Sequence, residues 1–208
     1  MTRRTSHRLL ITTSLGVLMA AGGCHVSTKT ADPAASPEEM NWIEAIDYSK
    51  SLIGSPAPDF TVKPIREGEP DFTLSEAAAK GDAVVLAFWI RACEACCTHE
   101  MPSLGKLVQW SEENDLPVSV VTVHNHTGWY KQNSKSKRPS EEEIAKFNDA
   151  IKFYFEGPED DFMRVYGVRS WPRIYVIDSQ GIITFVQAHT GVDLFEELKV
   201  AVEEALEG

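Results

Sequence analysis

The sequence predicts an α/β fold in three layers, with helices on both faces of a central mixed sheet. Two apolar runs of strand length, residues 83–90 and 118–124, are typical of parallel strands buried on both faces. A helical stretch over residues 94–114 separates them. Near the C-terminus, residues 174–178 and 182–187 flank a Ser-Gln-Gly turn and predict a hairpin. Strands that alternate with helices and end in a hairpin are typical of a three-layer α/β/α sandwich.

The other elements follow the same order along the chain. Residues 59–65 and 71–74 predict a β-hairpin that extends the sheet at the N-terminal side. Pro102 lies inside the helix over 94–114 and is expected to kink it, because proline has no N–H to donate. The remaining predicted helices are 75–80, 140–155 (opened by a capping box at Ser140–Glu143), 160–166 and 193–206.

The N-terminus resembles an export signal of the lipoprotein type. A basic start with three arginines precedes an apolar stretch over residues 9–21, and small residues lead to Cys24. We expect residues 1–23 to be removed and Cys24 to be lipidated, which would anchor the protein to a bacterial membrane facing the periplasm or extracytoplasmic space. Ala21 stands where lipoboxes usually carry leucine, so an ordinary signal peptide that leaves Cys24 free is the alternative.

Between this signal and the domain at 51–208, residues 24–50 are polar and small and predict a flexible tether. A short amphipathic turn containing Trp42, Ile43 and Ile46, docked on the domain, is the alternative.

The charge balance excludes nucleic acid as a partner. The chain carries a formal net charge of −11, and loss of residues 1–23 removes three arginines and no acid, leaving −14. Such an acidic protein repels phosphate backbones, and it has no polybasic patch for binding lipid by charge.

The feature that carries chemistry is Cys93-Glu94-Ala95-Cys96, where an apolar strand gives way to a helix. The spacing allows the two sulfurs to form a short disulfide loop. The free amides at a helix N-terminus favour the thiolate of the first cysteine. We therefore expect Cys93 to be the attacking sulfur and Cys96 the resolving one.

Three blocks of residues resemble the thioredoxin superfamily, and most closely its exported, membrane-tethered branch related to TlpA and ResA. They are Gly54-Ser55-Pro56-Ala57-Pro58-Asp59-Phe60; Phe88-Trp89 followed by the cysteine pair and Glu100-Met101-Pro102; and Tyr166-Gly167-Val168 with Trp171-Pro172, then Ile177-Asp178 and Gly181. The resemblance covers about residues 54–206 and implies a thioredoxin-like fold and thiol–disulfide oxidoreductase activity without a cofactor.

The resemblance also implies roles for individual residues. Trp171-Pro172 is expected to be a cis bond opposite the cysteine pair, and Trp171, Pro172 and Trp89 are expected to bind substrate. Exported proteins with disulfides would be the substrates, and a membrane dithiol protein would supply electrons.

Two carboxylates near the cysteine pair also predict function. Glu100 is expected to be a buried carboxyl with a raised pKa that exchanges a proton near Cys96; a solvated carboxylate on the helix is the alternative. Glu94 places negative charge beside the Cys93 thiolate, which favours a reducing couple.

Three positions depart from the family pattern. Ala87 replaces a buried polar residue, so proton transfer to Cys96 must use Glu100 or Glu94. Ala95 stands where a proline is usual, and Cys97 follows the pair. Cys97 is interpreted either as a small buried residue or as a reactive third thiol that could bridge to Cys93.

Two other functions were weighed. A copper- or soft-metal-binding chaperone would use Cys93, Cys96 or Cys97 together with His99, and His124 and His126 could assist it. A peroxidase would need proline and threonine at the positions of Leu86 and Ile90, where nothing can orient a peroxide.

Overall fold

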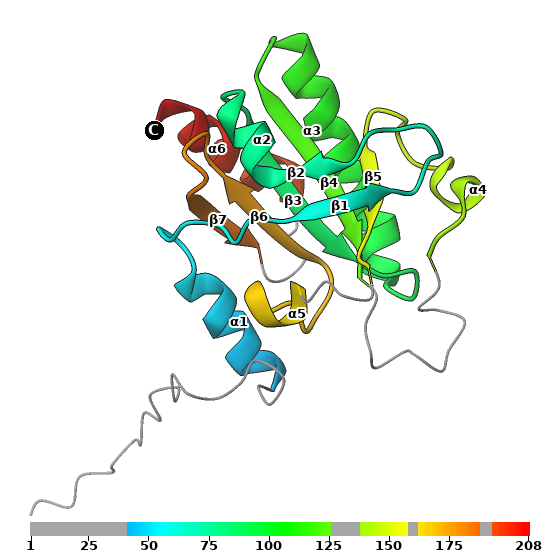
Figure 1. Cartoon of the computed structure of the whole chain (residues 1–208), viewed down its shortest axis with the longest axis horizontal. Helices are drawn as coiled ribbons and strands as arrows, with labels where there is room; N and C mark the ends of the chain where they lie inside the picture. Colours follow the sequence, from blue (N-terminus) through cyan, green and yellow to red (C-terminus); the bar gives the residue numbers. More distant parts are fainter. Residues whose placement is uncertain (1–40, 126–137, 158–161, 188–192) are drawn as a thin grey trace, which may run out of the picture. The chain divides into compact units, whose positions relative to one another are not determined.

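One seven-stranded mixed sheet, in the order β2-β1-β5-β4-β3-β6-β7, runs through the described part of the chain (Figure 1). The computed structural model describes residues 41–125, 138–157, 162–187 and 193–208. The predicted signal peptide, Cys24 and His126 therefore lie outside the described residues. No helix within the described ranges has the length and apolar character needed to cross a bilayer.

The strands are β1 Thr61–Pro64, β2 Phe72–Thr73, β3 Ala83–Trp89, β4 Val118–His124, β5 Lys152–Phe155, β6 Arg173–Ile177 and β7 Ile183–Gln187. The helices are α1 Trp42–Ser51, α2 Leu74–Ala79, α3 Met101–Glu113, α4 Glu141–Ile144, α5 Phe162–Val165 and α6 Leu194–Glu207, with a π-helical turn, η1, over Cys96–Glu100.

The two apolar runs form the parallel centre of the sheet, as predicted. β3 and β4 pair from Ala83 with Val118 to Trp89 with His124, and β5 continues the parallel set beside β4. Every residue of β3 is buried, because helices cover both of its faces. The carboxyl ends of these strands therefore meet at one edge of the sheet, where ligand and catalytic sites of parallel sheets usually lie.

Antiparallel hairpins complete the sheet on both sides, and both were predicted. β6 and β7 join the centre through β6, which pairs with β3. The N-terminal hairpin of β1 and β2 adds to β5. The three-layer arrangement is confirmed: α3 and α6 pack on one face of the sheet, and α1, α2 and α5 lie on the other.

The helix predicted over 140–155 is wrong beyond its first turn. Ser140 caps it as expected, and its side chain accepts a hydrogen bond from Glu143 N–H. The helix ends at Ile144, and residues 152–155 form β5 between β4 and β1. Ile144, Phe147 and Ile151 have helical spacing, but Phe153 and Tyr154 face opposite cores, as in a strand. Pairing with two neighbouring strands outweighs local propensity here.

Pro102 does not interrupt a helix. It lies in the first turn of α3, where its missing N–H leaves no hydrogen bond unmade. The π-helical turn precedes it, closed by a hydrogen bond from Met101 N–H to the Cys96 carbonyl. The predicted kink is therefore replaced by a change of helix type.

Residues 42–50, predicted as the end of a tether or as a docked turn, form most of α1. Asn41 caps this helix, with Glu44 completing a capping box. Ala45 and Ser49 are fully buried, and the Ser49 hydroxyl lies 3.2 Å from the Tyr166 carbonyl oxygen. Residues 42–50 therefore form a helix that packs on the rest of the domain, as in the docked alternative.

Candidate active site at the carboxyl edge of the sheet

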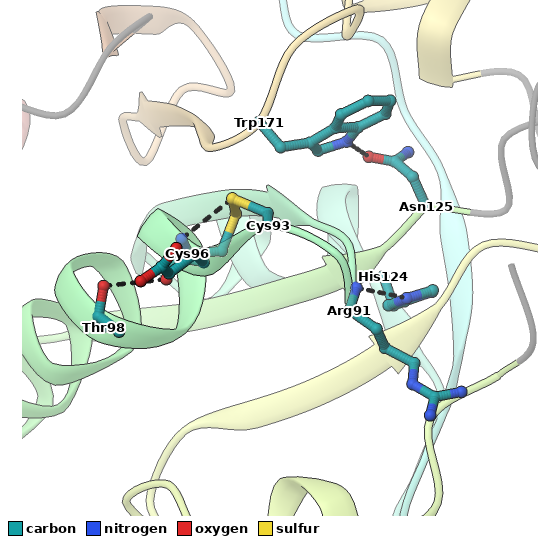
Figure 2. Close-up of a disulfide and its surroundings, with 8 residues drawn as sticks. Arg91, Cys93, Cys96, Thr98, His124, Asn125 and Trp171 are labelled. Atoms are coloured by element: carbon teal, nitrogen blue, oxygen red, sulfur yellow. Dashed lines mark hydrogen bonds between the residues drawn. A yellow bond between two sulfur atoms is a disulfide. The ribbon is translucent and has the colours of Figure 1, made fainter. Parts of the chain in front are cut away.

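The cysteine pair lies in the turn that follows β3 and in the first helical residues after it (Figure 2). Cys93 and Cys96 form a disulfide with their Cα atoms 5.2 Å apart. Cys93 is half-buried and Cys96 is fully buried. The Cys96 N–H donates to the Cys93 sulfur at 3.0 Å, a contact that also favours a thiolate at Cys93. The outer sulfur is therefore the one that an incoming disulfide can reach.

Glu100 is fully buried at the end of the π-helical turn, four residues after Cys96. Burial raises the pKa of its carboxyl well above the ordinary value of 4.5. Neither carboxyl oxygen has a hydrogen-bond partner among the described residues. A buried carboxyl with a raised pKa exchanges its proton at a higher pH than an ordinary glutamate does. Glu94, between the cysteines, is exposed to solvent.

Trp171 and the buried Pro172 are joined by a cis peptide bond, as the resemblance implied. The pairing of Phe88 with Arg173 brings this segment alongside the end of β3. Figure 2 shows the Trp171 side chain on the Cys93 side of the disulfide. Its indole N–H donates to Asn125 Oδ1 at 2.7 Å. Trp171 is half-buried, so part of its ring can meet a partner chain.

Trp89, predicted to bind substrate, is a core residue. Only 2% of it is exposed, and its ring packs edge-on against His124 and Phe153. As the last residue of β3 it faces the α3 side of the sheet, where the core covers it. The Trp89 side chain is therefore too buried for the predicted substrate contact, and it supports the active site from within the core.

His124 is buried beside Trp89 rather than lining a groove. Its Nε2 accepts a hydrogen bond from Arg91 N–H at 3.2 Å (Figure 2), and its ring stacks on Phe155. This bond needs a lone pair on Nε2, so the imidazole holds the turn before the cysteines in its neutral form.

Cys97 is a free, half-buried thiol. It lines a pocket of about 310 Å³ together with Arg91, Lys146 and Phe147. Burial raises the pKa of the Cys97 thiol; Lys146 opposes this rise and Glu100 adds to it. The bridge from Cys93 runs to Cys96, so the conceivable Cys93–Cys97 disulfide is not formed.

The residues of the metal-chaperone alternative are not brought together as a ligand set. Cys93 and Cys96 are bonded to each other, and His99 is exposed. Within the described ranges, no group of three or more histidine, cysteine or acidic side chains could hold a metal ion.

Sequence reasoning missed Glu156 and gave Asn125 no role of its own. Both are buried at the carboxyl edge, and Asn125 Nδ2 donates to Glu156 Oε2 at 2.9 Å. Glu156 follows β5, the strand that was predicted as a helix, so its place beside Asn125 could not be foreseen. The sequence signal that was available is the short aromatic run Phe153-Tyr154-Phe155, followed directly by an acid.

Comparison with known proteins agrees with this geometry. Residues 53–186 match the model of the AhpC/TSA family. The chain belongs to the AhpC/TSA family. It is 31% identical over 153 residues to the thioredoxin-like protein YneN of Bacillus subtilis, which covers 69% of this chain and 78% of the relative. It is 28% identical over 148 residues to the thiol-disulfide oxidoreductase ResA of Oceanobacillus iheyensis, with 69% of each chain covered.

A solved structure confirms the fold. The thiol-disulfide isomerase of Corynebacterium glutamicum superposes with a TM-score of 0.59 at 19% identity, over 74% of this chain and 97% of that one. The protein is a thioredoxin-like thiol-disulfide oxidoreductase of this family.

Proposed function

We propose that this protein reduces disulfides of exported partner proteins through Cys93 and Cys96, outside the cytoplasm and on a lipid anchor. The observation that carries the chemistry is the asymmetric pair: a half-buried Cys93 bonded to a fully buried Cys96 beside Trp171 and Pro172. Only one of the two sulfurs is open to a large partner, and the other is protected from it.

The reaction conserves atoms and electrons. In the reduced enzyme, the Cys93 thiolate attacks one sulfur of the partner disulfide, and the partner's other sulfur leaves as a thiolate. Cys96 then attacks the Cys93 sulfur of the mixed disulfide and releases the second partner thiol. The partner gains two electrons, and the enzyme ends in the disulfide form. A membrane dithiol protein would return the pair to the reduced state.

Glu100 is the proposed proton acceptor for Cys96. Cys96 has no exposed surface, so water cannot take its proton directly. Glu100 is buried on the same turn, and its raised pKa brings its proton exchange closer to neutral pH. Ala87 in the strand below offers no polar group for this purpose. Glu94 is exposed and acts, in this proposal, only through its charge near Cys93.

The proposed location rests on the N-terminal sequence. Residues 1–23 resemble a lipoprotein signal that ends before Cys24. A Cys24→Ala variant should be found in the soluble extracytoplasmic fraction, whereas the wild type should sediment with membranes. Sedimentation of both proteins would contradict the lipid anchor.

The redox couple is tested by equilibrating the metal-free protein in graded mixtures of reduced and oxidised dithiothreitol. Free thiols are then alkylated and located by peptide mass spectrometry. We expect Cys93 and Cys96 to change state together as a reversible two-electron couple, with Cys97 alkylated throughout. A Cys96→Ser variant should accumulate a mixed disulfide at Cys93 with a disulfide substrate, and a Cys93→Ser variant should not. Bridges scattered through Cys97, or stoichiometric Cu(I) retained on gel filtration, would overturn the proposal.

A further inference from the structure

A chain of hydrogen bonds runs from the surface of the active site into the protein. The Trp171 indole N–H donates to Asn125 Oδ1 at 2.7 Å, and Asn125 Nδ2 donates to Glu156 Oε2 at 2.9 Å. The other Glu156 oxygen accepts the backbone N–H of Phe162 at 3.2 Å. One half-buried aromatic ring beside the disulfide is thus tied to the first residue of α5 through two buried polar side chains.

The two inner members of this chain are fixed in position. Asn125 is 1% exposed and Glu156 is 2% exposed. The Asn125 N–H donates to the Trp89 carbonyl at 2.9 Å, and the Glu156 N–H donates to the His124 carbonyl at 3.0 Å. Their backbones therefore extend β4 and β5 at the edge where β3 delivers the cysteine pair. Such support from rigid elements is what a precisely held side chain needs.

The hydrogen-bonding properties of the Trp171 indole and the Glu156 carboxylate restrict which side chain can lie between them at position 125. An indole N–H can only donate, and a carboxylate can only accept. A side chain between them must accept on one side and donate on the other, which an amide does. Aspartate would set two carboxylates against each other, and leucine would leave the indole N–H and a Glu156 oxygen without these partners. The amide therefore has one orientation that satisfies both neighbours.

We propose that Asn125 and Glu156 are positioning residues that hold the Trp171 ring beside the Cys93–Cys96 disulfide, so that the half-buried Trp171 presents a fixed surface to the partner protein. This inference rests on the proposed function. Because the two residues act through Trp171 and not on the sulfurs, they affect binding of a large disulfide substrate and leave the intrinsic reactivity of Cys93 unchanged.

The test uses the full-length protein in detergent, insulin as the protein disulfide and dithiothreitol as the reductant. Asn125→Leu removes both side-chain hydrogen bonds of Asn125. We expect KM for insulin to rise about tenfold at unchanged kcat, because the Trp171 ring loses the hydrogen bond that fixes it. The rate of reduced Cys93 with the small disulfide dithiobisnitrobenzoate should not change. Ser119→Ala is the matched control: it removes a 2.8 Å side-chain hydrogen bond to Asp82, at the start of β4, and should leave both readouts unchanged.

A double-mutant cycle separates positioning from a general loss of structure. Trp171→Phe keeps an aromatic ring but removes the donor, so adding Asn125→Leu to it should raise KM little further. Hydrogen exchange of the Trp171 indole N–H, assigned by its absence in Trp171→Phe, should be faster in Asn125→Leu than in the wild type. If Asn125→Leu does not fold, the same measurements are made on Glu156→Gln. The two Glu156 oxygens accept separately from Asn125 and from Phe162, and glutamine replaces one of these oxygens with an NH2 group that cannot accept.

The outcomes distinguish the two proposals. A wild type that reduces neither insulin nor dithiobisnitrobenzoate would overturn the proposed function, and this inference with it. An active wild type whose variants keep the same KM would overturn the positioning role alone. A fall in the dithiobisnitrobenzoate rate, or strictly additive effects in the cycle, would also overturn it, since the residues would then act on Cys93 or on stability.

Discussion

Cys93 and Cys96 differ in exposure although only two residues separate them. The first closes the turn after β3, where its N–H donates to the Ile90 carbonyl, and the second begins the π-helical turn under the core. In the proposed mechanism this difference assigns the outer sulfur to attack on a partner and the inner one to its release. It also leaves Glu100, on the buried side of the same turn, as the nearest acidic group with a perturbed pKa.

A Glu100→Gln variant should become more stable relative to the wild type as the pH rises. Burial raises the pKa of Glu100 in the folded state well above 4.5, so the folded protein keeps a proton that the unfolded chain releases. The stability linked to this proton is complete below the unfolded pKa and is lost as the pH rises through the folded pKa. The loss is at most about 1.4 kcal/mol per pH unit. Urea unfolding of the oxidised protein from pH 4.5 to about pH 8 measures it.

Glu94→Gln is the control for this prediction, because it removes the same charge at an exposed position. Its stability should follow the wild type across the pH range. Parallel curves for the wild type and Glu100→Gln would show that Glu100 has no raised pKa in the folded state.

At the scale of elements, the docking of α1 is decided by a close approach at Gly167. A Cβ atom added there would lie 2.6 Å from Tyr48 Cδ1 and 3.0 Å from Ser49 Oγ, both on α1, and Gly167 has a φ of +66°. Only glycine has neither the side chain nor the backbone penalty at this position. The turn after α5 can therefore pack closely against α1 only because residue 167 has no side chain.

Gly167→Ala should destabilise the protein by about 2–5 kcal/mol, the sum of overpacking and a left-handed alanine. Gly181→Ala is the matched control: its φ is +76°, but nothing lies within 4 Å of the added Cβ. It should cost only about 1–2 kcal/mol, from the backbone alone. Urea unfolding compares the two, and limited proteolysis between residues 41 and 53 should be faster in Gly167→Ala. If both variants lose the same free energy of unfolding, α1 accommodates the added Cβ at residue 167 without strain, and the packing argument is wrong.

Sequence patterns predicted two kinds of element well: strands that are buried on both faces, and hairpins whose turn joins strands adjacent in the chain. β3 and β4 read as continuous apolar runs because both faces are covered, and the hairpin of β6 and β7 is set by the turn at Gly181. β5 was misassigned because its residues satisfy a helical and a strand pattern at once. Pairing with β4 and β1, which are distant in sequence, decided between them.

At the scale of the whole molecule, the redox state and the stability of the fold are linked. Full burial of Cys96 disfavours charge on its sulfur, and the charge of Glu94 opposes the Cys96 N–H, which favours a thiolate at Cys93. The proposed function requires a reducing couple, and in a reducing couple the disulfide form is the more stable fold.

We therefore expect the oxidised protein to unfold at a higher urea concentration than the protein reduced with dithiothreitol. Each ~30 mV by which the native couple is more reducing than that of the unfolded chain adds about 1.4 kcal/mol to this difference. Cys97→Ala, measured in both states, should show the same difference, because Cys97 takes no part in the couple. A reduced form that is the more stable would make the protein an oxidant of its partners.

The sequence by itself determined the fold class and the cysteine pair, because these depend on burial patterns and on residues adjacent in the chain, whereas the cis-proline block was implied by the resemblance to a known family. It also indicated that Glu100 could be a buried carboxyl near Cys96. It did not indicate that the two oxygens would have no hydrogen-bond partner among the described residues. Only the tertiary structure decided that Trp89 is buried, that residues 42–50 dock on the domain, and that Asn125 meets both Glu156 and Trp171. Each of these depends on strands and turns distant in sequence reaching one sheet edge, and local spacing carries no information about such meetings.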